Sequence, residues 1–209
     1  MTQLDELELA ALLSSRICHD VINPVGAIAN GLEVLAEETD QTVRDSALDL
    51  IRKSAAQASA KLQFARLAFG AAGSSGADID LRDAEQVARG IIDPAKHRLQ
   101  WQGLAATVAK DKAKLLLNMI SLALAALPRG GAIAVAIGGD QSNPTFEIRC
   151  HGEAARIAEH VPALIAGGNG HVLDSHSVQP YYAGRVAAAA GMVLKAEKTG
   201  EDVVLRAAA

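Results

Sequence analysis

The residues with the clearest chemical potential in this sequence are a histidine and an acid side by side, His19 and Asp20. They are followed by Asn23 and Pro24. A histidine ring is a nucleophile at neutral pH when one nitrogen is held by a hydrogen bond and the other is free. Asp20 can accept that hydrogen bond. The chemistry that these residues could support is the transfer of a phosphoryl group to and from a ring nitrogen of His19.

The apolar residues around His19 recur every three or four positions, which is typical of an amphipathic helix. They are Leu9, Leu13, Ile17, Val21, Pro24, Ile28, Leu32 and Leu35. We expect one long helix from about Leu4 to Glu38. Because Pro24 has no N–H group, the carbonyl of Asp20 should lose its helical partner, and the helix should kink one turn after His19.

The face of this helix that carries His19 suits contact with another protein. At about 100° per residue, His19 points away from the apolar stripe and into solvent. The face is polar and partly flat because Gly26 has no side chain. Arg16, one turn before His19, could help to neutralise a phosphoryl group. The residues that we predict to contact a partner are Ser15, Arg16, Gly26, Ala27, Asn30 and Glu33.

A second amphipathic helix is predicted from about Gln41 to Phe69, after a turn at Thr39 and Asp40. Two such helices form an antiparallel hairpin that cannot bury both of its faces. Two hairpins from two chains bury them by forming a four-helix bundle. We therefore predict a homodimer.

Residues 71–77 are small and rich in glycine and serine, which predicts a linker between a first region, 1–70, and a second region, 78–209. Helical and strand patterns alternate in the second region. This alternation indicates an α/β sandwich with helices on one face of a mixed sheet, and the whole chain is α+β. We expect helices at 81–92, 110–127, 154–165 and 178–190, and strands at 99–102, 132–138, 145–150, 192–198 and 202–206.

The composition narrows the function further. Of the 209 residues, 50% are hydrophobic and only 3% are aromatic, which favours helices packed through small side chains. A net charge of −4 gives no support for nucleic-acid binding, and no apolar run is long enough to cross a membrane. The acidic first residues and the two cysteines, too few for a disulfide framework, favour a cytoplasmic protein with free thiols.

Four residues match the H-box of histidine kinases, in which a histidine is followed by Asp or Glu, then by Thr or Asn, and then by Pro. They are His19, Asp20, Asn23 and Pro24. The wider stretch 17–33 resembles more specifically the ChpT-type histidine phosphotransferases of alphaproteobacteria, and the resemblance covers nearly the whole chain. It implies a histidine-kinase-like dimerisation hairpin followed by a degenerate ATPase-like domain.

The resemblance also implies roles for the residues. His19 would be the phosphoacceptor, Asp20 would orient or activate it, and Pro24 would shape the helix. Asn23 corresponds to a position that can assist dephosphorylation of the partner in related kinases.

The second region lacks the residues with which a kinase of this fold binds ATP. Leu122 stands where the family has its Mg²⁺-binding asparagine, and a leucine cannot coordinate a hard cation. Cys150 replaces the aspartate of the adenine-binding motif. Ala154 replaces the second glycine of that motif, although Gly152 remains. The stretch 176–183 offers no run of glycine N–H groups to cradle phosphates. We therefore expect this chain to bind no ATP, no cofactor and no metal.

Four histidines in the second region raise the question of a metal site. They are His151, His160, His171 and His176. Their spacing matches no familiar ligand pattern, so we interpret them as scattered surface residues.

These observations predict a histidine phosphotransferase of a two-component phosphorelay. The resemblance implies that the donor is a phosphoaspartate in the receiver domain of a hybrid histidine kinase. The acceptors would be receiver domains of response regulators, and the Mg²⁺ would sit in the receiver. Two alternatives stay open: an ATP-dependent sensor histidine kinase fragment, and a non-catalytic dimeric scaffold for receiver domains.

Overall fold

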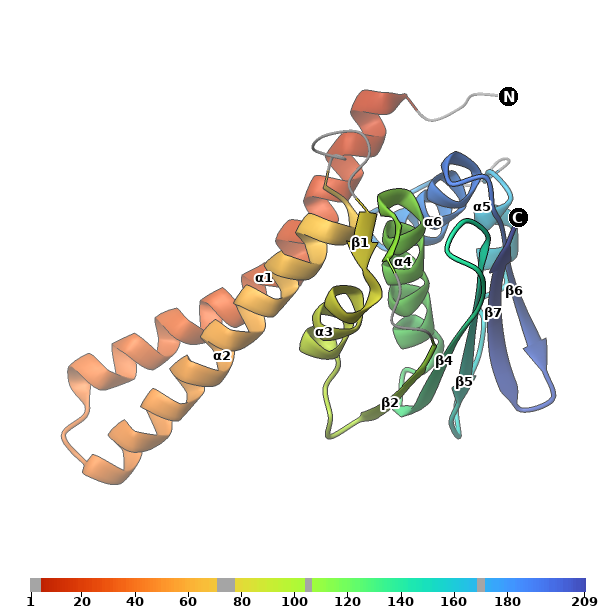
Figure 1. The fold of residues 1–209 in the computed structure, drawn as a ribbon. Coiled ribbons are helices and arrows are strands. Elements are labelled where there is room, and N and C mark those ends of the chain that lie inside the picture. The colour runs from red at the N-terminus through yellow and green to blue at the C-terminus, as the bar shows by residue number, and fades with distance from the viewer. Residues whose placement is uncertain (1–4, 71–77, 104–106, 169–171) are drawn as a thin grey trace.

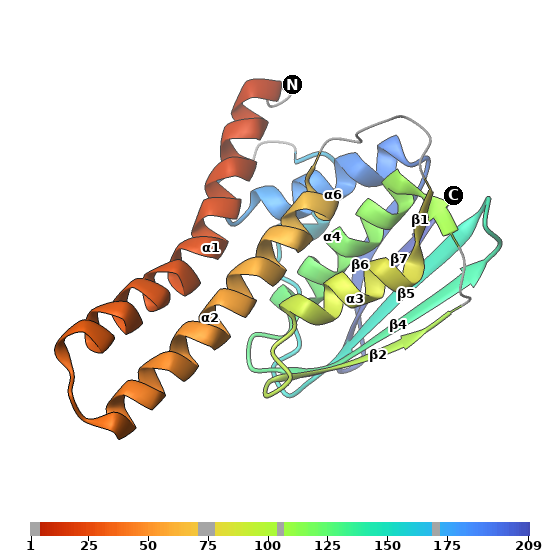
Figure 2. The same ribbon diagram turned by 60° about the vertical axis from the view of Figure 1, so that its left-hand side comes forward.

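The computed structural model describes residues 5–70, 78–103, 107–168 and 172–209. A long helical hairpin lies beside a layer of helices, and that layer covers one face of a five-stranded sheet (Figures 1 and 2). This arrangement confirms the predicted α+β class, a hairpin followed by an α/β sandwich. The predicted linker, 71–77, lies outside the described residues.

The hairpin consists of α1 (Glu6–Glu37) and α2 (Gln41–Ala68). The carboxylate of Asp40 accepts hydrogen bonds from two backbone N–H groups in the first turn of α2, which fixes where this helix begins. The two helices approach closely at Gly31, where a Cβ atom would lie 2.7 Å from the side chain of Ile51. Glycine is therefore needed at this crossing.

Helix α1 runs through Pro24 without ending. Figure 2 shows that the two halves of the helix run in different directions, in keeping with the predicted kink. Pro24 is buried, and it is one of the residues through which α1 packs in the hairpin.

The large sheet of the second region has the strand order β2-β4-β5-β7-β6. Strands β2 and β4 are parallel and the other neighbours are antiparallel, so the sheet is mixed as predicted. The bounds are His97–Gln102 for β2, Gly131–Gly139 for β4, Pro144–His151 for β5, Val193–Thr199 for β6 and Asp202–Ala208 for β7.

A second, two-stranded sheet was not predicted. It pairs β1 (Asp78–Asp80) with β3 (Thr107–Ala109) in antiparallel fashion. Strands of three residues are too short to show the alternation of apolar and polar residues by which a strand is recognised in a sequence.

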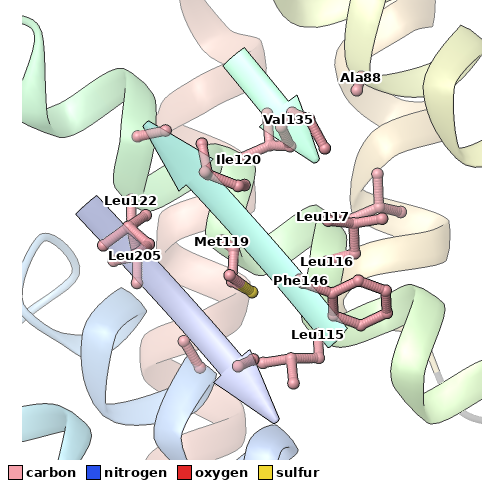
Figure 3. Close-up of a cluster of buried hydrophobic side chains, with 14 of the residues drawn as sticks. Ala88, Leu115, Leu116, Leu117, Met119, Ile120, Leu122, Val135, Phe146 and Leu205 are labelled. Atoms are coloured by element: carbon pink, nitrogen blue, oxygen red, sulfur yellow. The ribbon is translucent and has the colours of Figure 1, made fainter. Parts of the chain in front are cut away.

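Helix α4 (Lys110–Ala126) forms the centre of the second region. It lies against the sheet, with α3 (Leu81–Ile91) and α6 (Val178–Ala189) beside it in the layer of helices, and it also contacts α2 of the hairpin (Figures 1 and 2). Every residue of α4 from 115 to 120 is buried. Figure 3 shows side chains of α4 among Val135, Phe146 and Leu205 of the sheet. The middle of α4 is apolar except for Asn118, and this is the part that the structure buries.

The predicted helix 154–165 is wrong in its first half, because only α5 (Val161–Ile165) is helical. The N–H of Ala155 donates to the carbonyl of Gly152, and the N–H of Arg156 donates to the carbonyl of Ala126 in α4. These bonds hold the chain in turns. The helix begins only where Pro162 occupies its first turn, a position that proline favours.

The hairpin is fastened to the second region through a buried amide. Asn118 of α4 donates from Nδ2 to the carbonyl of Ala68 at 2.9 Å and to that of Lys114 at 2.8 Å. Its Oδ1 accepts a hydrogen bond from Nε2 of Gln179 in α6 at 2.7 Å. One side chain thus joins the end of α2 to both α4 and α6.

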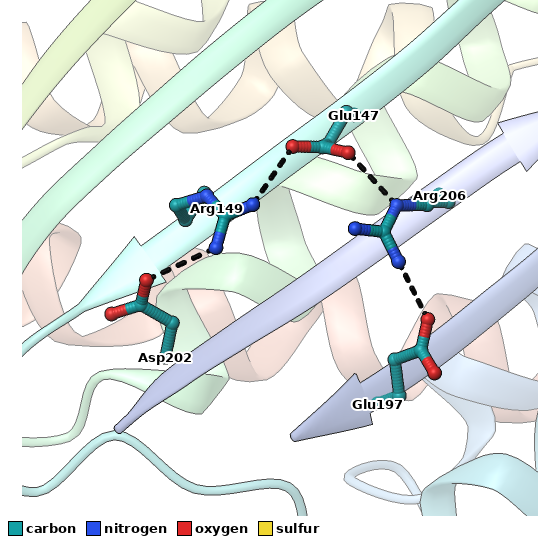
Figure 4. Close-up of polar contacts among 5 residues, drawn as sticks. All are labelled: Glu147, Arg149, Glu197, Asp202 and Arg206. Atoms are coloured by element: carbon teal, nitrogen blue, oxygen red, sulfur yellow. Dashed lines mark hydrogen bonds and ion pairs between the residues drawn. The ribbon is translucent and has the colours of Figure 1, made fainter. Parts of the chain in front are cut away.

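The other face of the sheet has no helix over it and carries a chain of ion pairs instead (Figure 4). Arg149 lies 3.2 Å from Asp202 and 3.3 Å from Glu147. Arg206 lies 2.8 Å from Glu147 and 2.7 Å from Glu197. Exposed ion pairs add little stability, so their main effect is to keep this open face polar.

Candidate functional site

His19 lies on the outward face of α1, with 54% of its side chain exposed, as the helical spacing predicts. Oδ1 of Asp20 is 3.7 Å from Nδ1 of His19. This distance is too long for a hydrogen bond but close enough for electrostatic attraction, which favours a proton on Nδ1. Nε2 is then the nitrogen with a free lone pair. The predicted hydrogen bond to Asp20 is therefore absent in this geometry, although the acid stands on the expected side.

The other oxygen of Asp20 pairs with Arg16 one turn earlier in α1. Nε of Arg16 donates to Oδ2 of Asp20 at 3.1 Å. The same guanidinium donates to the carbonyl of Ser175 at 3.5 Å, in the loop before α6. Arg16 therefore fixes the acid beside His19 and also connects α1 to the second region.

Lys61 of α2 completes the helix at the point where Pro24 interrupts it. Its Nζ donates to the carbonyl of Asp20 at 2.7 Å, the carbonyl that has no helical donor because Pro24 lacks an N–H. The sequence predicts the unpaired carbonyl but not its donor. A second positive charge thus lies beside the residue that follows His19.

The loop before α6 brings a second imidazole to the site. The ring centroids of His176 and His19 are 5.2 Å apart, and the ring planes meet at 79°. We interpreted His176 from the sequence as a scattered surface residue. It is exposed, but it is not isolated. No spacing rule could have found this contact, because the two residues come from opposite ends of the chain.

This loop is built around Asp174. Its carboxylate accepts hydrogen bonds from the N–H of His176 at 2.9 Å and from the N–H and hydroxyl of Ser177 at 2.7 Å each. The bonds from Ser177 and His176 lower the pKa of Asp174 to about 2, so this carboxylate is ionised at any ordinary pH. The backbone around His176 is held in place independently of His19.

The other residues predicted to contact a partner lie along α1. Ser15, Asn30 and Glu33 are exposed, and Gly26 and Ala27 are half-buried. Asn23, which belongs to the predicted H-box, is exposed as well. A Cβ atom at Gly26 would meet nothing within 4 Å, so this part of the helix is flat and open, as predicted.

Two cavities lie near the site. The first, of about 230 Å³, opens between the hairpin and the second region and is lined in part by Arg16, Asp20 and Lys61. The second, of about 160 Å³, is lined in part by Arg16, His176 and Leu122. Arg16 borders both cavities.

The positions that correspond to the ATP-binding motifs of kinases lie in apolar or tightly packed surroundings. Leu122 lines the second cavity with other apolar residues, among them Val203 and Leu205. Cys150 is fully buried, and burial raises the pKa of its thiol to about 12, so it is uncharged where the kinases carry an aspartate. Gly152 lies against the backbone of Gly130, where a Cβ atom would come within 2.6 Å of the carbonyl oxygen, so packing alone requires this glycine.

Neither a metal site nor a membrane-spanning helix is found in the described part of the chain. No group of three or more histidine, cysteine or acidic side chains in it could hold a metal ion, and His171 lies outside it. No helix in the same residues is long and apolar enough to span a membrane.

Comparison with known proteins decides the family. A model described as the histidine phosphotransferase C-terminal domain matches residues 81–202. The chain is 46% identical over 205 residues to protein phosphotransferase ChpT of Brucella abortus (strain 2308), which covers 98% of this chain and 97% of that protein. The chain belongs to the histidine phosphotransferase family.

Solved structures agree with this assignment. A bacterial phosphotransferase matches with a TM-score of 0.88 and 44% identity, over 99% of this chain and 98% of that one. Full-length ShkA in complex with AMPPNP matches with a TM-score of 0.50 and 14% identity, over 94% of this chain and 45% of that one. At that identity the second likeness concerns the fold alone.

In this histidine phosphotransferase, both regions contribute to the surroundings of His19. The hairpin supplies His19, Asp20, Arg16 and Lys61. The second region supplies His176 and the carbonyl that holds Arg16. The site combines an exposed imidazole with two cationic side chains that are bonded to Asp20, and such groups can bind a phosphoryl group.

Proposed function

We propose that Nε2 of His19 takes a phosphoryl group from a phosphoaspartate in the receiver domain of a hybrid histidine kinase and passes it to the receiver of a response regulator. The observation that carries this proposal is the exposure of His19 with an acid on the side of Nδ1. Membership of the histidine phosphotransferase family supports it.

The reaction needs no proton to move. The lone pair of Nε2 attacks phosphorus while the bond to the donor carboxylate breaks, and the carboxylate leaves with that electron pair. The ring then carries a positive charge, which the carboxylate of Asp20, 3.7 Å from Nδ1, stabilises. In the second step a carboxylate of the acceptor attacks, and the electron pair of the N–P bond returns to Nε2.

The positive groups of the site act on the phosphoryl group rather than on the ring. Arg16 and Lys61 lie beside Asp20 and offset the negative charge that a phosphorylated partner brings. The Mg²⁺ that such transfers use would belong to the receiver. We expect the receiver to dock on the polar face of α1, over Gly26, and Asn23 lies within this face.

We infer that the phosphoryl group does not come from ATP. The apolar side chain of Leu122 and the neutral thiol of Cys150 support this, because neither can replace the oxygen ligands of Mg²⁺ or the acid that recognises adenine. Calorimetric titration with ATP and Mg²⁺ should give no binding heat. A saturable heat would favour the alternative of an ATP-dependent kinase.

We also propose that the protein is a homodimer through the hairpin. Ile22, Val25 and Leu32 of α1 are exposed, and their spacing places them in one stripe. Leu48 and Leu62 of α2 are exposed as well. A second copy would cover both stripes in a four-helix bundle.

Transfer from a radiolabelled phosphoreceiver tests the central proposal. We expect label on the wild-type chain and none on His19→Ala. His151→Ala, on the open face of the sheet, is the matched control and should be labelled like the wild type. Label that persists on His19→Ala would exclude His19 as the phosphoacceptor. If signalling through the receiver domains is unchanged in the His19→Ala variant, the alternative of a non-catalytic scaffold would be favoured.

A further inference from the structure

The contact between His19 and His176 has no place in the function proposed above. The two rings meet edge to face with centroids 5.2 Å apart, and both side chains are exposed. We propose that His176, in its positively charged form, binds the phosphoryl group carried by His19 and stabilises the phosphohistidine. This inference rests on the proposed role of His19 as the phosphoacceptor.

The geometry brings the two groups within reach of one another. A phosphoryl group on Nε2 extends outward from the edge of the His19 ring, on the side away from Asp20. At the observed separation of 5.2 Å, rotation of the His176 side chain is enough to place one of its N–H groups against a phosphoryl oxygen. An imidazolium that donates to a phosphate oxygen makes a charge-assisted hydrogen bond, which is about twice as strong as a neutral one.

The backbone that carries His176 is fixed from both sides. Within the loop, the carboxylate of Asp174 holds the N–H groups of His176 and Ser177, and the carbonyl of Asp174 accepts from the N–H of Val178 at 2.9 Å. Across the domain contact, Arg16 donates to the carbonyl of Ser175. The loop therefore presents His176 to the site without an ordering cost at the moment of transfer.

The charged groups around His176 allow it to respond to a phosphoryl group. From α1, His19 contacts its ring, and Arg16, which is paired with Asp20, lines the same cavity. In its own loop, Asp174 accepts a hydrogen bond from the N–H of His176. The cavity of about 160 Å³ that His176 lines is also lined by Arg156 and His160. The negative charges of Asp20 and Asp174 are therefore balanced by the positive charges of Arg16 and Arg156. A phosphoryl dianion on His19 adds the largest new charge to this environment and favours the protonated form of His176.

The test is the equilibrium constant for phosphoryl exchange between His19 and the aspartate of a receiver domain. This constant compares the free proteins, so a lost contact with the receiver changes the rates of exchange but not the constant. We compare the wild type with His176→Gln, which is polar and neutral, and with His176→Lys, which is always charged. His151→Gln is the control, because that histidine pairs with Asp202 on the open sheet face.

The expected result has a definite sign. At pH 6 the constant for the wild type should favour phosphorylated His19 about tenfold more than that for His176→Gln, a size typical of one close charge at a half-exposed site. Histidine loses its charge as the pH rises, so the two constants should converge by pH 8.5. His176→Lys should keep the high value at both pH values, and His151→Gln should match the wild type.

Two failures would be distinct. If the constant for His176→Gln equals that of the wild type at pH 6 while His19 is still phosphorylated, the role of His176 is wrong and the proposed function stands. If His19→Ala still takes up the phosphoryl group, the proposed function itself is wrong. A constant that falls equally for His176→Gln and His176→Lys would also overturn the role of charge.

Discussion

At the scale of single residues, the site depends on how one carboxylate is shared. Asp20 lies 3.7 Å from the ring of His19 through one oxygen and 3.1 Å from Arg16 through the other. The hydrogen bond from Arg16 favours the orientation in which the other oxygen of Asp20 faces the ring. The arginine therefore positions the acid, and in the proposed transfer the acid would stabilise the positive charge on the ring.

This arrangement predicts the effect of Asp20→Asn. The amide keeps the shape of the side chain but removes the negative charge that faces Nδ1, so the rate of transfer to His19 should fall about 10- to 100-fold. Rapid-quench measurement of label on His19 gives the rate. Asp49→Asn, which removes an exposed acid of α2 that pairs only with Arg52 among the contacts described, should leave the rate unchanged. An unchanged rate for Asp20→Asn would show that the acid has no part in the reaction.

Cys150 is a second residue whose environment sets its chemistry. Burial raises the pKa of its thiol to about 12, so the reactive thiolate is almost absent below pH 10. In a Cys18→Ser background, iodoacetamide at pH 8.5 should leave the folded protein unmodified and should modify one thiol after unfolding in urea. Mass spectrometry counts the adducts. Because the unfolded thiol ionises at lower pH than the buried one, the free energy of unfolding should also decline above about pH 9.

At the scale of helices and strands, Asn118 joins three elements that the chain must assemble before the site exists. Its side chain bonds to the end of α2, to its own helix and to α6. Asn118→Ala would leave the carbonyl of Ala68 and the amide of Gln179 buried without these partners. We expect the free energy of unfolding to fall by about 2 kcal/mol, measured by urea denaturation. Asn143→Ala, in the exposed turn between β4 and β5, should change it by less than about 0.5 kcal/mol.

The elements themselves were largely predictable, and the exceptions have physical reasons. The bounds of helices α1, α2, α4 and α6 were predicted to within a few residues. In each helix apolar residues recur every three or four positions, and a capping residue or a glycine turn marks one end. The prediction of a helix over 154–165 was wrong in its first half, because backbone hydrogen bonds to Gly152 and to α4 override the local helix propensity. Strands β1 and β3 were too short to leave a pattern.

At the scale of the whole molecule, only those site residues that are close to His19 in the sequence could be predicted. The offset of Asp20 and Pro24 from His19 and the polar face of α1 follow from helical geometry. Lys61, Ser175 and His176 reach the site through the packing of α2 and α6 against α1, and no spacing rule relates them to His19. The second region is predicted as a former ATP-binding domain, and the sequence does not predict its contribution to the surroundings of His19.

The proposed dimer is the last level of organisation, and it must leave His19 accessible if His19 exchanges phosphoryl groups with a receiver. At about 100° per residue, Val25 and Leu32 are turned from His19 by about 120° and about 140° around α1. A second hairpin packed on this stripe would leave the polar face of α1 free for a receiver. Assembly and phosphotransfer then use different faces of one helix.

Leu32→Glu tests this separation of faces. Its side chain is 54% exposed in the single chain and would be buried in the bundle, where an unpaired carboxylate costs several kcal/mol. Light scattering after gel filtration should give twice 21.7 kDa for the wild type and 21.7 kDa for Leu32→Glu. Val193→Glu, at an equally exposed apolar residue of the sheet, should remain dimeric. A dimeric Leu32→Glu would place the interface elsewhere, because no packed bundle core accepts a glutamate from each chain at this position.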